Sequence, residues 1–245
     1  MKALGWEQNR RIRTYGNDGS PVIVLHGGPA ESGGSALVAQ GLSDHFRVFE
    51  PWQRLSSHKP LSVAVHIADL HHLINSRCRD KKPALVGESW GAMLALAHAS
   101  EHPEHTGPVV LIGCGTFDKM SRADLSKVRE RRIRDYIEKH PKHSSDLDLS
   151  LGEQIMKWHE MTDVYDLAPN TPAKEEPEPF DMRAHTETWN DMLCCQEKGL
   201  YPQSFSSISS PVIMLHGAYD PHPGKMIRDS LMPYMGYNQK LCMTN

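Results

Sequence analysis

A serine flanked by glycines lies where a short apolar segment gives way to a helix-forming one. Ala84–Val86 precedes the motif GESWG at residues 87–91, and residues 92–97 are rich in alanine and leucine. A strand, a sharp turn and a helix in this order expose the hydroxyl of Ser89, and only small side chains fit where the helix leaves the strand. The start of the helix and the backbone N–H of Trp90 then face a developing oxyanion. We predict that Ser89 is a nucleophile that attacks a carbonyl carbon, the alternative being an ordinary glycine turn.

A glycine-rich loop supplies a second donor for the same oxyanion. The motif HGGP at residues 26–29 directly follows the apolar segment Pro21–Leu25. Glycine allows the backbone to turn an N–H inward, so we predict that Gly28 donates to the oxyanion together with Trp90. We expect His26 to hold the loop by hydrogen bonds rather than to act in catalysis. A plain turn at the end of a strand is the alternative.

An aspartate follows the serine in the second half of the chain. Asp220 ends the motif HGAYD at residues 216–220, just beyond the apolar segment Pro211–Leu215. A carboxylate in this place accepts a hydrogen bond from a catalytic histidine and stabilises the imidazolium. Asp118, after the apolar segment Val109–Ile112, is the competing acid. We favour Asp220 because its motif is fuller and because Asp118 suits the start of a helix.

The general base is the weak point of this arrangement. The only histidine after Asp220 is His222, which lies between Pro221 and Pro223. A histidine two residues from the acid can hardly reach Ser89 and also keep its bond to the carboxylate. We therefore predict a loop residue at His222, with a substitute base as the alternative.

Other histidines lie on two predicted helices. They are His71, His72, His98, His102 and His105. We expect them to be solvated or helix-terminal, because no HExxH or comparable metal-ligand spacing occurs. No metal and no cofactor are predicted. The basic run Lys127–Arg134 is likewise predicted to be a solvated helix face rather than a nucleic-acid site.

Short apolar runs supply the elements that would position these residues. Four of them have the length and flanks of buried parallel strands, namely Pro21–Leu25, Ala84–Val86, Val109–Ile112 and Pro211–Leu215. Between the first two, apolar residues recur at i, i+4, i+7 and i+11 from Val63, behind Ser62 as N-cap. The alternation of strands and helices predicts an α/β fold whose strands deliver loops to one edge of a sheet.

The stretch from Thr116 to Ser206 breaks this alternation, because it contains no convincing strand. Ser121–Asp124 resembles a capping box that opens a helix, which His140-Pro141 would stop. Asp166–Pro179 holds four prolines and several acids, so we expect an exposed loop. We predict an N-terminal core part at 1–115, a helical cap at 116–206, and an incomplete C-terminal core part at 207–245.

Composition bounds the class of protein. The 245 residues are 39% hydrophobic, with 27 basic against 30 acidic residues and a net charge of −3. These values are ordinary for a globular protein and exclude the positive field that nucleic-acid binding needs. Five cysteines without paired CxxC spacing suggest reduced thiols. No secretory signal and no run near the roughly 18 apolar residues of a membrane span occur, so we expect a cytoplasmic protein with no membrane partner. The oligomeric state stays open.

These motifs together resemble the α/β-hydrolase family, and within it the proline iminopeptidase branch. The HGGP loop, the GxSWG turn and the late HGxxD carry the resemblance, supported by Phe49–Arg54 and by the GCG motif at residues 113–115. It covers roughly residues 3 to 235. The family often has glycine where Ala30 and Leu55 stand here.

The resemblance implies a mostly parallel sheet with flanking helices and a helical cap. It implies a serine hydrolase that cleaves amide or ester bonds of small molecules or short peptides through an acyl-enzyme on Ser89. Acids of the cap, Glu175, Glu176 and Glu178, would bind a substrate amino group or form an exposed charge run. The family carries its catalytic histidine in a Gly-His pair after the last strand. No histidine follows Gly236 in this sequence. Impaired activity is thus expected, and an inactive binding protein or truncated remnant is the alternative.

Overall fold

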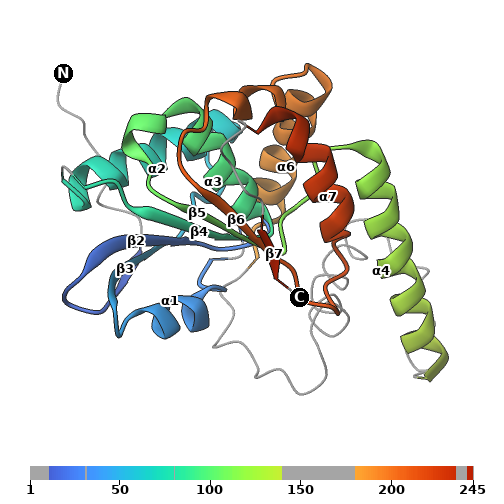
Figure 1. The fold of residues 1–245 in the computed structure, drawn as a ribbon. Coiled ribbons are helices and arrows are strands. Elements are labelled where there is room, and N and C mark those ends of the chain that lie inside the picture. Colours follow the sequence, from blue (N-terminus) through green and yellow to red (C-terminus); the bar gives the residue numbers. More distant parts are fainter. Residues whose placement is uncertain (1–10, 31, 80, 140–179, 236–241, 245) are drawn as a thin grey trace.

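The structure, a computed structural model, describes residues 11–30, 32–79, 81–139, 180–235 and 242–244. Among these residues seven strands form one sheet, in the order β1-β3-β2-β4-β5-β6-β7 (Figure 1). The strands are β1 Ile12–Tyr15, β2 Ser20–Leu25, β3 Phe46–Pro51, β4 Ala84–Glu88, β5 Val109–Ile112, β6 Val212–Leu215 and β7 Cys242–Thr244. β1 pairs antiparallel with β3, and each other pair of neighbours is parallel. The predicted α/β class with a mostly parallel sheet is confirmed.

Helices cover both faces of the sheet. Figure 1 shows α2 and α3 on one face and α1 on the other. The α-helices described are α1 Ala36–Leu42, α2 Val63–Arg77, α3 Trp90–Glu101, α4 Lys119–Lys139, α6 Met182–Glu197 and α7 Gly224–Leu231. Three-residue to five-residue 3-10 helices are η1 Pro103–His105, η3 Gln203–Ser207 and η4 Met232–Tyr234. A search of the described helices finds none with the length and apolarity needed to cross a membrane.

The elements predicted from apolar periodicity are confirmed. β5 has the predicted bounds, and β2, β4 and β6 differ from their predicted bounds by one or two residues. The helix predicted after Ser62 is α2, and the Ser62 hydroxyl accepts a hydrogen bond from the N–H of Val65 at 3.3 Å. β1, β3 and β7 were not expected as strands.

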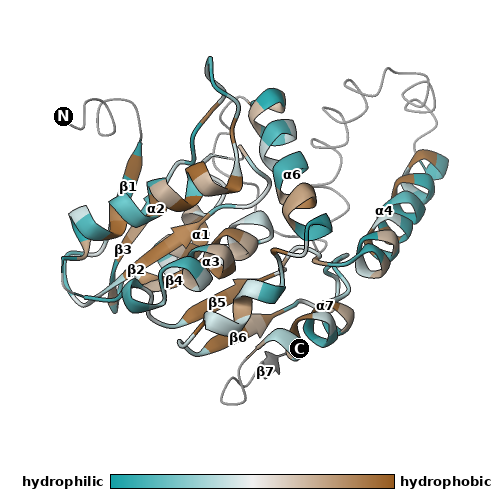
Figure 2. Ribbon diagram, turned by 90° about the horizontal axis from the view of Figure 1, so that it is seen from above, coloured by the Kyte–Doolittle hydropathy of each residue, from teal (hydrophilic) through white to brown (hydrophobic). Residues whose placement is uncertain are grey.

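The alternation of side chains along β2 explains why its sequence is apolar throughout. Val22 and Val24 pack into a cluster with Ala39 of α1, whereas Ile23 and Leu25 belong to the larger cluster under α2 and α3. Both faces of the strand are therefore covered, as is usual for a parallel strand. Figure 2 shows hydrophobic colouring along the central strands, as this coverage requires.

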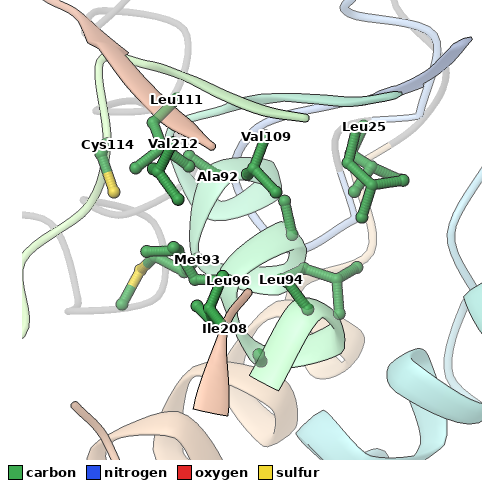
Figure 3. Close-up of a cluster of buried hydrophobic side chains, with 14 of the residues drawn as sticks. Leu25, Ala92, Met93, Leu94, Leu96, Val109, Leu111, Cys114, Ile208 and Val212 are labelled. Carbon is green, nitrogen blue, oxygen red and sulfur yellow. The ribbon is translucent and has the colours of Figure 1, made fainter. Parts of the chain in front are cut away.

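Helix α3 forms the centre of the larger cluster. Its residues from Trp90 to Ala99 are all buried. Leu111 of β5, Val212 of β6 and Ile208 lie against it, as Figure 3 shows. Because α3 begins directly after Ser89, this packing fixes the serine at the carboxyl edge of the sheet.

The start of α4 differs from the sequence prediction. The expected capping box at Ser121 is wrong, because α4 already begins at Lys119. Asp118 caps the helix instead: its carboxylate accepts the N–H of Ser121 at 2.8 Å and the Ser121 hydroxyl at 2.6 Å. The acid that competed with Asp220 thus has a role at the start of a helix.

Replacing Asp118 with alanine is expected to lower the free energy of unfolding by about 1 kcal/mol, the usual cost of losing an N-cap. Asp124→Ala is the matched control, because Asp124 lies inside α4, and we expect it to change stability by less than about 0.5 kcal/mol. Urea unfolding of the three proteins measures both values. Equal losses in the two variants would contradict the assignment of Asp118 as the cap.

The stretch predicted as a cap contributes only helical elements where the structure describes it. These are α4, α6 and η3. The loop Asp166–Pro179, with Glu175, Glu176 and Glu178, lies outside the described residues. The division into a core at 1–115 and 207–245 and a cap at 116–206 stays a prediction.

Helix α6 is fastened to the segment that precedes α2. The carboxylates of its N-cap Asp181 and of Glu187 and Asp191 accept the backbone N–H groups of Ser56, Leu61 and Val63, the first residue of α2, at 2.8, 2.9 and 2.8 Å. Hydrogen bonds to carboxylates are stronger than those between neutral groups. This part of the predicted cap is therefore held firmly against the face of the sheet that α2 covers.

Candidate functional site

The turn at Ser89 has the strained geometry that the sequence predicts. Ser89 joins β4 to α3 with φ at 49°, a left-handed conformation that non-glycine residues rarely adopt. A Cβ added to Gly87 would lie 2.3 Å from the carbonyl carbon of Gly91. A Cβ added to Gly91 would lie 2.2 Å from the carbonyl oxygen of Leu25. The two glycines of the motif are therefore required by close contact between backbones.

The backbone of Ser89 is fixed, and its hydroxyl makes no capping bond. Its N–H donates to the carbonyl of Ile112 at 2.9 Å, and its own carbonyl accepts from Ala92 at 3.2 Å. The side chain does not cap α3. The first N–H groups of a helix have no partner in a preceding turn, so the N–H of Trp90, the first residue of α3, is placed to donate to an anion near the hydroxyl.

The HGGP loop is held beside this turn through Gln53, a residue that the sequence analysis did not single out. Gln53 donates its backbone N–H to Nε2 of His26 at 3.0 Å, so His26 carries its proton on Nδ1, which lies 3.0 Å from the carbonyl of Gly27. The side chain of Gln53 accepts from Nε1 of Trp90 at 2.7 Å. One glutamine thus joins the segments that carry both predicted oxyanion donors.

The same loop contains two left-handed residues. Gly28 has φ at 27° and Ala30 has φ at 77°. An alanine in this region costs roughly 1 to 2 kcal/mol relative to ordinary helical or extended backbone. This gives a physical reason for the glycine that the resembling family often has where Ala30 stands.

Asp220 lies at the carboxyl edge of β6 with its carboxylate directed at β5. Gly113 has a left-handed φ of 52°, which favours glycine, and a Cβ added there would lie 2.7 Å from Oδ2 of Asp220. Gly113 follows Ile112, whose carbonyl holds the N–H of Ser89. The structure therefore brings Ser89 and Asp220 to the two sides of the end of β5, as expected for parallel strands that deliver loops to one edge.

His222 is bound to Asp220. Oδ1 of Asp220 accepts the backbone N–H of His222 at 2.9 Å and faces its Nδ1 at 2.8 Å. The side chain of His222 is 10% exposed. An imidazole whose Nδ1–H is bound by a carboxylate keeps Nε2 as the nitrogen that can take a proton. The contact is the one that a catalytic histidine makes with its acid, although it is formed here within a single turn.

A second histidine lies on the other side of Asp220. Nδ1 of His216 is 3.6 Å from Oδ2, and the imidazole is buried against Gly224. Burial lowers the pKa of His216 despite the neighbouring carboxylate. We take His216 to be a neutral packing residue of the turn.

The pKa of Asp220 predicts a specific acid sensitivity. Burial raises this pKa, but the hydrogen bonds from His222 and the electrostatic interactions with His222 and His216 outweigh it and hold the pKa below its ordinary value. The ionised carboxylate therefore stabilises the folded chain fully above the unfolded-state value of about 3.9, and this stabilisation is lost as the pH falls through the lower folded value. In Asp220→Asn the free energy of unfolding should fall less steeply below about pH 4. Urea titrations from neutral to acid pH measure it, and parallel curves for both proteins would contradict the assignment.

The histidines of α2, α3 and η1 follow the expectation in part, because His72 and His105 are exposed. His98 lies in the last turn of α3, but it is fully buried rather than solvated. His71 of α2 and His102 reach the same place, so that one ligand nitrogen of each ring lies within 4.8 Å of the others. His98 and His102 have the i, i+4 spacing that places two ligands on one helix face. The third member comes from another helix, which no local spacing reveals.

Comparison with known proteins supports one family. The chain matches the family described as alpha/beta hydrolase fold over residues 20–222. The proline iminopeptidase of Neisseria meningitidis serogroup A is 34% identical over 118 residues, which is 44% of this chain and 35% of that protein. The proline iminopeptidase of Xylella fastidiosa strain 9a5c is 29% identical over 105 residues, 39% of this chain and 32% of that protein. The match thus spans about a third of the length of these curated relatives.

Solved structures extend the likeness over nearly the whole chain. VinJ has a TM-score of 0.62 at 21% identity and covers 96% of this chain and 86% of its own. The enol-lactonase from Burkholderia xenovorans LB400 has a TM-score of 0.60 at 13% identity, with 96% and 88% covered. At these identities the likeness concerns the fold. Since the family match includes the Ser89 turn, the HGGP loop and Asp220, the chain belongs to the α/β-hydrolase fold family.

Proposed function

We propose that this protein is a serine hydrolase that cleaves amide or ester bonds of small substrates through an acyl-enzyme on Ser89. The observation that carries the proposal is the left-handed Ser89 turn, closed by Gly87 and Gly91 and opening directly into the buried helix α3. Such a strained turn is maintained only where the surrounding packing imposes it, and strain of this kind is concentrated at functional sites.

The chemistry divides into two steps. The Ser89 hydroxyl attacks the substrate carbonyl, and the N–H groups of Trp90 and Gly28 donate to the oxyanion of the tetrahedral intermediate. The base that removes the serine proton returns it to the leaving amine or alcohol, which departs and leaves an ester on Ser89. Water then attacks this ester, the same base removes its proton, and Ser89 is released with the acid product.

We assign the base of this chain to His222, held by Asp220, and we expect a low rate. The bond between them is made within one turn bounded by Pro221 and Pro223, so that the imidazole cannot be aligned on Ser89 independently of the acid. Misalignment removes most of the rate enhancement that a base provides, so turnover should be on the order of 10³- to 10⁴-fold below that of an intact triad.

Chemical rescue tests the base. His222→Ala should lower ester hydrolysis at least about tenfold, and added imidazole should restore part of the loss, because it supplies the missing proton acceptor. Ser89→Ala is the control, since imidazole cannot restore a nucleophile. Unchanged hydrolysis in His222→Ala would show that His222 is not the base.

Substrates are proposed from the proline iminopeptidase relatives. The experiment compares L-proline p-nitroanilide with its N-acetyl derivative and with p-nitrophenyl acetate. An enzyme of this branch should hydrolyse the anilide with the free imino group faster than the acetylated one, because the blocked nitrogen cannot be bound as a cation. Equal rates on the two anilides, or cleavage of the ester alone, would reject the proline-specific part and leave the wider hydrolase assignment in place.

A binding protein without catalysis is the second candidate function, favoured by the same tethering of His222 to Asp220. It predicts saturable binding of a small ester or amide with no turnover that depends on Ser89. The rescue experiment separates the two, because imidazole-restored hydrolysis requires a working nucleophile. We place either protein in the cytoplasm, a proposal supported by the free thiols Cys78, Cys114, Cys194 and Cys195.

A further inference from the structure

A cluster of histidines lies far from the proposed catalytic residues, where the second half of α2 meets the end of α3. His71 comes from α2, and His98 and His102 come from the last turn and C-cap of α3. His98 is nine residues beyond Ser89 along α3, which at 1.5 Å per residue is about 14 Å. The cluster therefore lies toward the opposite edge of the sheet and has no part in the chemistry proposed for Ser89.

The hydrogen bonds around His98 determine its tautomer. The Thr106 hydroxyl donates its proton to the carbonyl of His102 at 3.0 Å, so toward His98 its oxygen can only accept. Nδ1 of His98, 3.0 Å from that oxygen, is therefore the protonated nitrogen. Nε2 keeps its lone pair, is buried, and has no hydrogen-bond partner. A fully buried imidazole thus directs an unpaired lone pair into the cluster, which ordinarily costs stability.

The two half-buried histidines complete a set of three ligands. One nitrogen of each ring lies within 4.8 Å of the others. In a tetrahedral zinc site with bonds of 2.0 to 2.1 Å the nitrogens are about 3.3 Å apart, so the rings need to close by no more than about 1.5 Å. The ring centroids of His71 and His102 are stacked 3.8 Å apart, and both residues are partly exposed, so a rotation of these two side chains is the movement that metal binding would require.

Neighbouring groups suit ligand histidines. The Thr106 hydroxyl oxygen accepts the Nδ1 proton of His98, as the outer partner of a metal-bound imidazole does. The side-chain nitrogen of Asn75 lies 3.0 Å from Nε2 of His71, and metal binding through Nδ1 would require this amide to turn so that its oxygen accepts the Nε2 proton. Nδ1 of His71 is buried and without a hydrogen-bond partner.

We propose that His71, His98 and His102 bind one divalent transition-metal ion of the zinc class, with water in the fourth position. Neutral imidazoles in a tetrahedral arrangement are typical ligands of Zn²⁺, whereas Mg²⁺ and Ca²⁺ require oxygen ligands. The ion would link α2 to the end of α3 and to the segment at Thr106. It would therefore stabilise the fold rather than take part in hydrolysis.

The test uses the full chain without a histidine tag, freed of metal by a chelator and titrated with Zn²⁺ in a calorimeter. We expect one ion per chain and a thermal midpoint that rises with Zn²⁺ concentration. His71→Ala and His102→Ala should each weaken the affinity for Zn²⁺ by at least about 100-fold. Loss of a residue that only supports a ligand already costs up to about 100-fold, and loss of a ligand itself should cost more. Co²⁺ in place of Zn²⁺ should give the visible absorption of a tetrahedral site without the thiolate charge-transfer band that cysteine ligands produce.

His72→Ala is the matched control, since His72 neighbours His71 on α2 and is exposed. It should leave the affinity and stoichiometry unchanged, and Ser89→Ala should do the same. Circular dichroism of the metal-free variants checks that each is folded. Three results would each overturn the site. They are the absence of saturable binding, an affinity in His71→Ala and His102→Ala equal to that of the unmodified chain, and a loss of affinity in His72→Ala as large as in those two variants. Because the readouts are binding and stability, the result does not depend on whether the chain hydrolyses any substrate.

Discussion

Replacing Ser89 with alanine should reduce hydrolysis of p-nitrophenyl acetate at least about 100-fold, to the background of the buffer and protein surface. The reason is that the substituted chain keeps its oxyanion donors but has no atom that can form the acyl-enzyme. With an intact triad the loss is on the order of 10⁶-fold, and it is smaller here because His222 is a poorly aligned base. Initial rates at saturating ester, measured on equal concentrations of the two proteins, give the value.

Ser100→Ala is the matched control for this variant. Ser100 lies near the other end of α3, and its hydroxyl donates to the carbonyl of Ala97 at 2.8 Å. The same chemical change at this position should leave the rate within about twofold, because Ser100 lies about 16 Å along α3 from Ser89, at 1.5 Å per residue. If Ser89→Ala retains the parent rate, the turn is a structural feature and the hydrolase proposal is wrong.

Gly91→Ala should produce the largest loss of stability. The added Cβ would lie 2.2 Å from the carbonyl oxygen of Leu25, which belongs to the neighbouring strand β2. No side chain can move aside there, since the contact is with backbone, so α3 would need to shift away from the sheet into its own packed cluster. We expect a cost of about 3 kcal/mol or more, or failure to fold. The midpoint of urea unfolding measures it.

Gly41→Ala provides the same substitution without the contact. A Cβ at Gly41, inside α1, meets no atom within 4 Å. Alanine is the better helix former, so this variant should gain about 0.5 to 1 kcal/mol. A gain at Gly41 with a large loss at Gly91 is the expected pair. Equal changes at both positions would show that α3 does not lie against β2 as described.

Much of the fold could be predicted from the sequence because its central strands are covered on both faces. A strand such as β2 needs apolar residues at every position, and a continuous apolar run is visible without knowledge of its partners. β1 could not be found in this way. It is an edge strand in which Arg13 bonds the buried carboxylate of Glu50 on β3 at 2.8 Å, so charged residues occupy both strands.

The parts of the site that depend on local geometry could be predicted, and those that depend on tertiary contacts could not. The Ser89 turn and its two glycines lie within five consecutive residues, so the motif and its flanking segments predict them, although the contact of Gly91 with Leu25 is visible only in the structure. Gln53 joins His26 to Trp90 only after three segments have packed together. His71 approaches the end of α3 for the same reason. The sequence indicates that Asp118 suits the start of a helix, but its capping-box pattern predicts the cap at Ser121, three residues after the observed one.

Mass spectrometry of the chain after reaction with a fluorophosphonate probe tests the central proposal most directly. This reagent forms a stable phosphonyl ester with an activated serine and does not require rapid turnover, so it reports the nucleophile even where the base is poor. We predict one adduct per chain, located by peptide mapping to Ser89 and absent from Ser89→Ala. No adduct on the folded chain, or an adduct on another residue that persists in Ser89→Ala, would contradict the assignment of Ser89 as the nucleophile.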